Sequence, residues 1–128
     1  MKLPPKEISA AEWELIHAVW QAEEPVTVRQ VLDQTYPNGE KAYTTVMTLM
    51  NILVDKGFLA RSKQGRVNYY APAIRREEVL RGSLANIAQR MFQGSWGAMA
   101  SFLVHSMPLT PEELEDLKRT LDKQGGNQ

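Results

Sequence analysis

Cysteine is absent from this chain of 128 residues, and histidine occurs only at His17 and His105. Without thiols the chain cannot form disulfides or a thiolate-ligated metal site, which excludes the usual copper-sensing chemistry. Two imidazoles would need unusual further ligands to hold a structural zinc ion. We therefore expect no metal, no other cofactor and a reducing compartment, the cytoplasm.

Long apolar runs and a surplus of charge are also missing. No window is long enough to cross a bilayer, and no apolar run follows a basic N-terminal segment, so we expect no membrane partner. Lys plus Arg and Asp plus Glu number 15 each, which argues against a purely electrostatic nucleic-acid binder but leaves room for local basic patches. No nucleophile elbow, phosphate loop or carboxylate pair is recognisable, so we expect no enzyme.

The stretch from Ala42 to Lys56 is predicted to form a helix with two different faces. Its apolar side carries Ala42, Val46, Leu49, Met50 and Leu53. Its other side carries Thr44, Thr48, Asn51 and Asp55, flanked by Thr45, Ile52 and Met47. Short hydroxyl and amide side chains on an outer face suit a helix that enters a DNA groove, because long side chains would hold it away from the base edges.

A short hairpin is predicted directly after this helix. Gly57 is placed to end the helix in a left-handed conformation. Strands are expected over residues 58–63 and 66–71, with Gln64 and Gly65 as the turn between them. Helix, glycine and basic-tipped hairpin together predict the recognition half of a winged helix.

The rest of the chain is predicted to be helical. Ser9 and Glu12 form a capping box before a helix over residues 10–22, Val26 is a candidate edge strand, and Thr27 caps a second helix. Beyond Pro72, helices are expected over residues 74–92 and 96–104 and from residue 110 onward. The predicted fold class is mainly α with a small β-hairpin wing: a winged helix-turn-helix DNA-binding domain over residues 1–73 and a C-terminal helical dimerisation region over residues 74–128.

The C-terminal helices carry more apolar surface than so small a winged domain can cover. A second copy of the chain would bury this surface, and a two-fold dimer would present two recognition helices to successive major grooves of a pseudo-palindrome. The predicted dimerisation residues are Leu84, Ile87, Met91, Trp96, Met99, Phe102, Leu103 and Leu117.

Seven residues are predicted to contact double-stranded DNA: Lys41, Thr44, Thr45, Thr48, Asn51, Lys63 and Arg66. The threonines could instead be an ordinary solvated face, and the basic hairpin residues, which include Arg61, could only protect an exposed strand edge. Lys56 and Arg29 are further phosphate candidates, although Lys56 could simply balance the negative end of its helix. Because this helix contains no Arg, we expect an operator read mainly at A·T steps or through shape.

Several motifs resemble the penicillinase-repressor family of BlaI/MecI-type winged-helix regulators. They are Ile8–Trp20 (ISAAEWELIHAVW), Tyr43–Leu49 (YTTVMTL), Leu53–Phe58 (LVDKGF), Asn68–Tyr70 (NYY) and Leu109–Leu114 (LTPEEL). The resemblance implies a homodimeric repressor of resistance or stress genes that leaves its operator when a sensor protease cuts it. It also implies that Thr45 and Thr48 touch DNA while the wing around Arg66 lies on the backbone.

The chain departs from this family pattern at the sites of specificity and induction. Met47 and Ile52 stand where the best-known relatives carry Arg, and no Asn precedes Phe102 or Leu103, near which the relatives' scissile Asn-Phe pair would fall. The inducing signal therefore stays open between proteolysis at another bond and a ligand. The alternative to a repressor is a winged-helix protein-interaction module without specific DNA binding, which would show no salt-dependent binding to upstream DNA.

Overall fold

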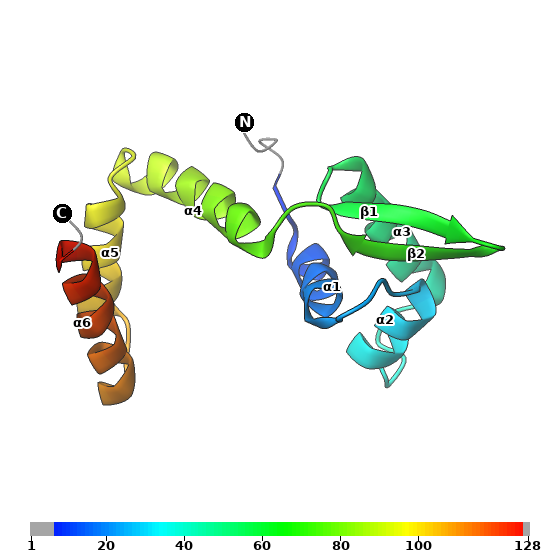
Figure 1. Cartoon of the computed structure of the whole chain (residues 1–128), viewed down its shortest axis with the longest axis horizontal. Helices are drawn as coiled ribbons and strands as arrows, with labels where there is room; N and C mark the ends of the chain where they lie inside the picture. The colour runs from blue at the N-terminus through cyan, green and yellow to red at the C-terminus, as the bar shows by residue number, and fades with distance from the viewer. Residues whose placement is uncertain (1–6, 127–128) are drawn as a thin grey trace. The chain divides into compact units, whose positions relative to one another are not determined.

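The computed structural model describes residues 7–126. Along these residues lie helices α1 (Ala10–Gln21), α2 (Val28–Thr35) and α3 (Tyr43–Asp55), strands β1 (Leu59–Gln64) and β2 (Val67–Pro72), and helices α4 (Arg76–Phe92), α5 (Trp96–Ser106) and α6 (Pro111–Gly126) (Figure 1). The chain divides into two compact units, one reaching Leu84 and one beginning at Ala85.

The first helices begin where the sequence supplies caps. At α1 the Ser9 hydroxyl accepts from the Glu12 N–H at 3.2 Å and Glu12 Oε1 accepts from the Ser9 N–H at 2.7 Å, which confirms the predicted capping box. Thr27 and Gln30 form a second capping box at α2. Each box satisfies amide groups that the first helical turn leaves without partners.

The first unit is a winged helix with one apolar core. Helices α1, α2 and α3 contact one another, and the hairpin packs against all three. The core includes Leu15, Ile16, Val31, Val46, Met50, Leu53, Leu59, Tyr70 and Val79. The predicted fold class, mainly helical with a small hairpin wing, is therefore confirmed.

The hairpin forms one residue later than its sequence suggested. Gln64 pairs with Val67, so Gly65 and Arg66 form the loop and not Gln64 and Gly65. Gly65 has a φ of +63°, and a left-handed glycine at the first loop position is typical of two-residue hairpins. The correction places Arg66 at the tip of the wing.

Val26 contributes a single antiparallel bridge to Tyr70, in agreement with its prediction as a short edge segment.

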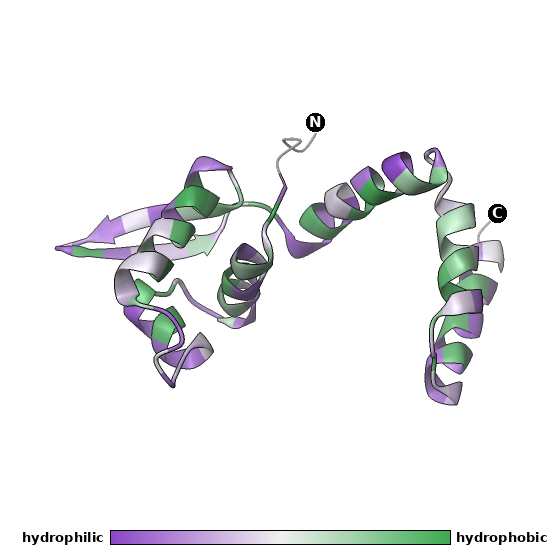
Figure 2. Cartoon of the chain, turned by 180° about the vertical axis from the view of Figure 1, so that it is seen from behind, coloured by the Kyte–Doolittle hydropathy of each residue, from purple (hydrophilic) through white to green (hydrophobic). Residues whose placement is uncertain are grey.

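The second unit has very little interior. Among residues 85–125, only Ala88 and Met99 are buried. The rings of Phe92 and Phe102 lie 5.9 Å apart, and Thr110 and Glu113 cap α6 reciprocally. Figure 2 shows apolar residues along α5. The large exposed apolar side chains of this unit are Met91, Trp96, Phe102, Leu103, Val104, Met107, Leu114, Leu117 and Leu121.

The functional division at residue 73 stays a prediction. Val79, in the second turn of α4, is 1% exposed and belongs to the core of the winged unit. The beginning of α4 is therefore physically part of the first unit.

No helix within residues 7–126 combines the length and the apolar character that crossing a membrane requires.

Candidate nucleic-acid interface

Helix α3 presents one buried and one exposed face. Val46, Met50 and Leu53 are fully buried, whereas Thr44, Thr45 and Thr48 are exposed. The buried residues fix the helix against the core, so the threonine hydroxyls and methyls face outward from a rigid support. Ala42, the residue before the helix, supplies no side-chain cap, and the first-turn amides of α3 therefore have no acceptor from it.

Asn51 joins α3 to the wing. Its Oδ1 accepts a hydrogen bond from Arg61 Nη1 at 2.6 Å and another from the Tyr70 hydroxyl at 2.9 Å. The side chain is half-buried. Its predicted contact with adenine stays a prediction, and the structure leaves the amide nitrogen, not the engaged oxygen, as the group best able to make it.

One face of the hairpin points toward α3. Arg61 is opposite Tyr70 and Lys63 is opposite Asn68, and paired residues of an antiparallel ladder lie on the same face. Since Arg61 and Tyr70 both bond Asn51, this is the face that meets α3. It brings Lys63 and Asn68 to the same side as Arg61.

A groove of about 490 Å³ lies between the start of α2, the first half of α3 and β2. The Arg29 guanidinium carbon lies 4.9 Å from the centre of the Tyr43 ring, a cation–π distance. Arg66 reaches the groove from the wing, and Met47 lines it from α3. Among the described residues, no Asp or Glu lines this groove, although Arg29 Nη1 lies 3.9 Å from Asp33 Oδ1 in a solvent-exposed ion pair.

Lys41 lies just before α3, beside the end of α2. Its Nζ is 5.4 Å from the centre of the Tyr36 ring. The Tyr36 hydroxyl donates to Glu14 Oε1 at 2.6 Å. Burial and this nearby carboxylate raise the pKa of Tyr36, so the phenol stays protonated and neutral under Lys41. The ammonium of Lys41 is free of any ion pair among the described residues that would compete with a phosphate.

Lys56 is engaged in a structural ion pair and is left out of the candidate interface. Its Nζ lies 2.9 Å and 3.1 Å from the two carboxylate oxygens of Glu12 and donates to the Glu7 carbonyl at 2.7 Å. Burial alone would raise the pKa of Glu12, but hydrogen bonds from Ser9 and Lys56 outweigh it and lower that pKa. The pair therefore ties the end of α3 to the start of α1 in charged form.

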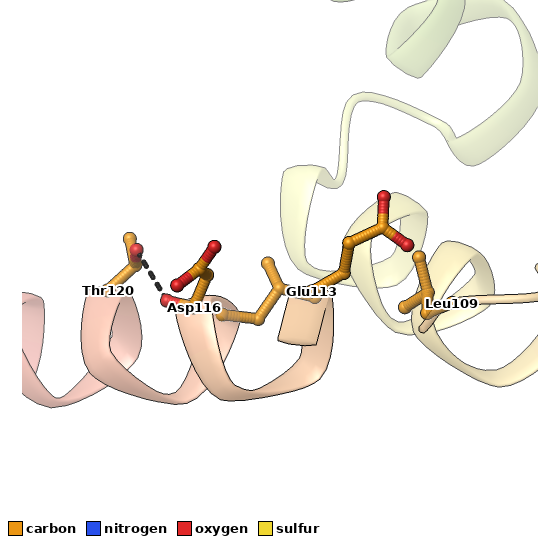
Figure 3. A pocket seen from close by; sticks show the side chains of 5 residues that line it. Leu109, Glu113, Asp116 and Thr120 are labelled. Carbon is orange, nitrogen blue, oxygen red and sulfur yellow. Dashed lines mark hydrogen bonds between the residues drawn. The ribbon is translucent and has the colours of Figure 1, made fainter. Parts of the chain in front are cut away.

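The predicted dimerisation residues fall into two groups. Leu84, Met91, Trp96, Phe102, Leu103 and Leu117 are exposed, and Ile87 is half-buried. Met99 is only 7% exposed and packs inside its own unit. A hollow of about 310 Å³ is lined by Leu109, which precedes α6, and by Glu113, Asp116, Leu117 and Thr120 of α6 (Figure 3). Because the Thr120 hydroxyl donates to the Asp116 carbonyl at 3.0 Å, that hydroxyl is already satisfied within the helix.

Tyr43, Met47 and Asn68 were not among the predicted site residues, yet they line the groove with Arg29 and Arg66. Helical periodicity already placed Met47 beside Thr44 and Thr48, so its exposure could have been predicted. Tyr43 and Asn68 depend on how α2 and the wing pack against α3. No local pattern reveals that packing.

Comparison with known proteins agrees with this architecture. The profile described as penicillinase repressor matches residues 8–123. The methicillin resistance regulatory protein MecI of Staphylococcus aureus is 23% identical over 91% of this chain and 94% of its own length. The transcriptional regulator BlaI of Mycobacterium tuberculosis is 34% identical over 80% of this chain and 74% of its own length.

One similar solved structure was determined together with a nucleic-acid partner. It is the solution structure of monomeric Bacillus licheniformis BlaI in complex with the blaP half-operator. It is 28% identical, covers 61% of this chain and 93% of that chain, and has a TM-score of 0.50.

Proposed function

Because the chain belongs to the penicillinase repressor family, we propose that it is a transcriptional repressor that binds operator DNA as a homodimer. The observation that carries the proposal is the exposed threonine face of α3 beside a groove that holds two arginines and, among the described residues, no carboxylate. A groove lined by two arginines and no carboxylate, beside short polar side chains, suits a duplex, since phosphates would meet the cations while the helix meets the bases.

The residues divide into base-reading and backbone-holding groups. Thr44, Thr45, Thr48 and the amide nitrogen of Asn51 would face the base edges of a major groove. Lys41, Lys63 and Arg66 would hold phosphates around them. Arg66 is supported for this role by its place in the hairpin loop, where its side chain is exposed.

The homodimer is proposed because the second unit buries very few of its apolar side chains. A unit of about forty residues that, over residues 85–125, buries only two side chains cannot offset the conformational entropy of ordering its helices. A second copy would cover the exposed apolar side chains, and a two-fold axis would pair the two winged units with the halves of a pseudo-palindrome. The residues proposed for this contact are Leu84, Ile87, Met91, Trp96, Phe102, Leu103 and Leu117.

A sensor protease of the kind that the family resemblance implies remains a proposed partner. Phe102 and Leu103 are exposed on α5, so a protease could reach this helix after local unfolding. Mass spectrometry of the chain recovered from cells treated with a cell-wall antibiotic tests this proposal. A new fragment ending within α5 would support it, whereas an intact chain that has nevertheless left its operator would point to a ligand.

The test of the main proposal is a mobility-shift titration on the DNA upstream of the chain's own gene, at two salt concentrations. Binding that persists in excess unrelated DNA and retards the duplex as a dimer would support an operator-binding repressor acting in the cytoplasm. Binding that the competitor abolishes would refute it in favour of a protein-interaction module. Repression itself is tested by a reporter gene placed behind the bound duplex.

A further inference from the structure

The recognition helix carries an exposed apolar flank that the proposed contacts do not use. Tyr43 and Met47 stand one turn apart on α3 with 40% and 36% of their surfaces exposed, and Val67, next to the wing tip, is 45% exposed. All three line the same groove. Exposed apolar side chains that gather in one groove are more informative than scattered ones, because such patches are typical of binding surfaces.

From this flank we infer that the protein recognises the C5-methyl groups of thymine in the major groove. The inference rests on the proposed function and specifies what the α3 surface reads. Met47 would supply most of the contact. It occupies the middle of the groove side of α3, and its unbranched, polarisable side chain can adapt to a methyl group.

The chemistry of the surroundings favours a duplex over an apolar peptide as the occupant. Arg29 lies against the ring of Tyr43, Arg66 precedes Val67 at the wing, and the Asn68 amide adds a polar group to the same groove. Phosphates beside an apolar contact would match these cations, because the major groove places base methyls between two phosphate backbones. A peptide that matched them would need paired acidic residues around one apolar side chain.

The side chains of α3 also leave few other ways to distinguish bases. The helix contains no Arg or Lys, so it cannot make the bidentate contact with guanine. The Asn51 oxygen is already occupied by Arg61 and Tyr70, which weakens the usual bidentate contact with adenine. The threonine hydroxyls can bond more than one base and so select among bases only weakly. Apolar contact is then the means by which this surface can select one base, and thymine is the base that presents a methyl group in the major groove.

The experiment replaces thymine with deoxyuridine in the shortest upstream duplex that the full chain binds specifically. This change removes the methyl group and keeps the base pair. We expect affinity to fall about fourfold for each contacted methyl that is removed, following the transfer free energy of one buried methylene. Deoxyuridine placed outside the footprint serves as the control for altered duplex flexibility and should have no effect.

Variants of Met47 connect the effect to the protein. Met47→Gln keeps the length of the side chain and makes its end polar, so this variant should bind the thymine duplex more weakly and lose its preference for thymine over uracil. Met47→Leu, the matched apolar control, should keep the preference. Equal affinity of the wild-type chain for both duplexes would overturn the inference and leave the proposed function standing. Failure to bind any upstream duplex specifically would overturn both.

Discussion

The ion pair between Lys56 and Glu12 gives the sharpest prediction about stability. Glu12 is 3% exposed, and its Oε1 accepts a hydrogen bond from Lys56 Nζ at 2.9 Å. Lys56 lies 44 residues further along the chain. Removing one partner of a buried pair costs about 3–5 kcal/mol, because the other charge stays behind without a partner. The Lys56 side chain is 24% exposed, and Glu12 keeps its bond from the Ser9 N–H, so both effects reduce the cost.

We therefore expect Lys56→Met to lower the free energy of unfolding by about 2–3 kcal/mol at pH 7. For a domain of this size that loss corresponds to a fall in Tm of about 10 °C or more. Urea titration of the full chain, followed by the fluorescence of Trp13 and Trp20 in a Trp96→Phe background, measures it. Arg75→Met is the matched control. Its pair with Glu78 is exposed on both sides, so its loss should cost about 0.5 kcal/mol or less.

The pH dependence separates a charge effect from a packing effect. In the native chain the pKa of Glu12 is lowered, so its contribution is present above the unfolded-state pKa of about 4.3 and is lost as pH falls through the lower folded value. Without Lys56, burial would raise that pKa instead, and protonation would then relieve the unpaired charge. The penalty of Lys56→Met should therefore shrink between pH 7 and pH 4. An equal penalty at both pH values would refute the reasoning.

Three further predictions concern the wing, the dimer and a helix end. Arg66→Ala should lower the salt slope of DNA binding by about one on every sequence, and a loss confined to one sequence would contradict a phosphate contact. Leu103→Asp should yield a folded monomer by light scattering, since Leu103 is exposed in the protomer, and an unchanged dimer would exclude this face. Gly57→Ala should cost about 1–3 kcal/mol in urea titrations because Gly57 has a φ of +89°; unchanged stability would show that the helix end relaxes.

Features that depend on neighbouring residues could be predicted from the sequence. The capping box at Ser9, the glycine that ends α3 and the presence of a hairpin after it involve groups a few residues apart, so a local pattern specifies them. The error of one residue at the hairpin turn has a physical cause. Gly65 can serve as the first or the second loop residue, and the strands on either side contain no apolar alternation strong enough to decide the register.

Features that depend on distant partners could not be predicted. Asn51 has the helical phase of a DNA-facing residue, but its partners Arg61 and Tyr70 approach only when the wing folds back onto α3. Lys56 has the position of a helix-end cation, but its partner Glu12 lies on another helix. Met99 belongs to an apolar helix face, and periodicity alone does not say whether a face packs within its own unit or against a second copy.

The fixation of the wing at its base has a consequence for how the protein selects its sites. Tyr70 is fully buried, pairs through its backbone with Val26 at 2.7 Å and 2.9 Å, and holds Asn51 through its hydroxyl. The angle between the wing and α3 is thus fixed in the free chain, so little conformational entropy would be lost there on DNA binding. In the proposed complex, a duplex whose shape does not match the fixed wing must then bend to fit it. Operators that bend easily at pyrimidine–purine steps would be favoured even at base pairs that no side chain touches.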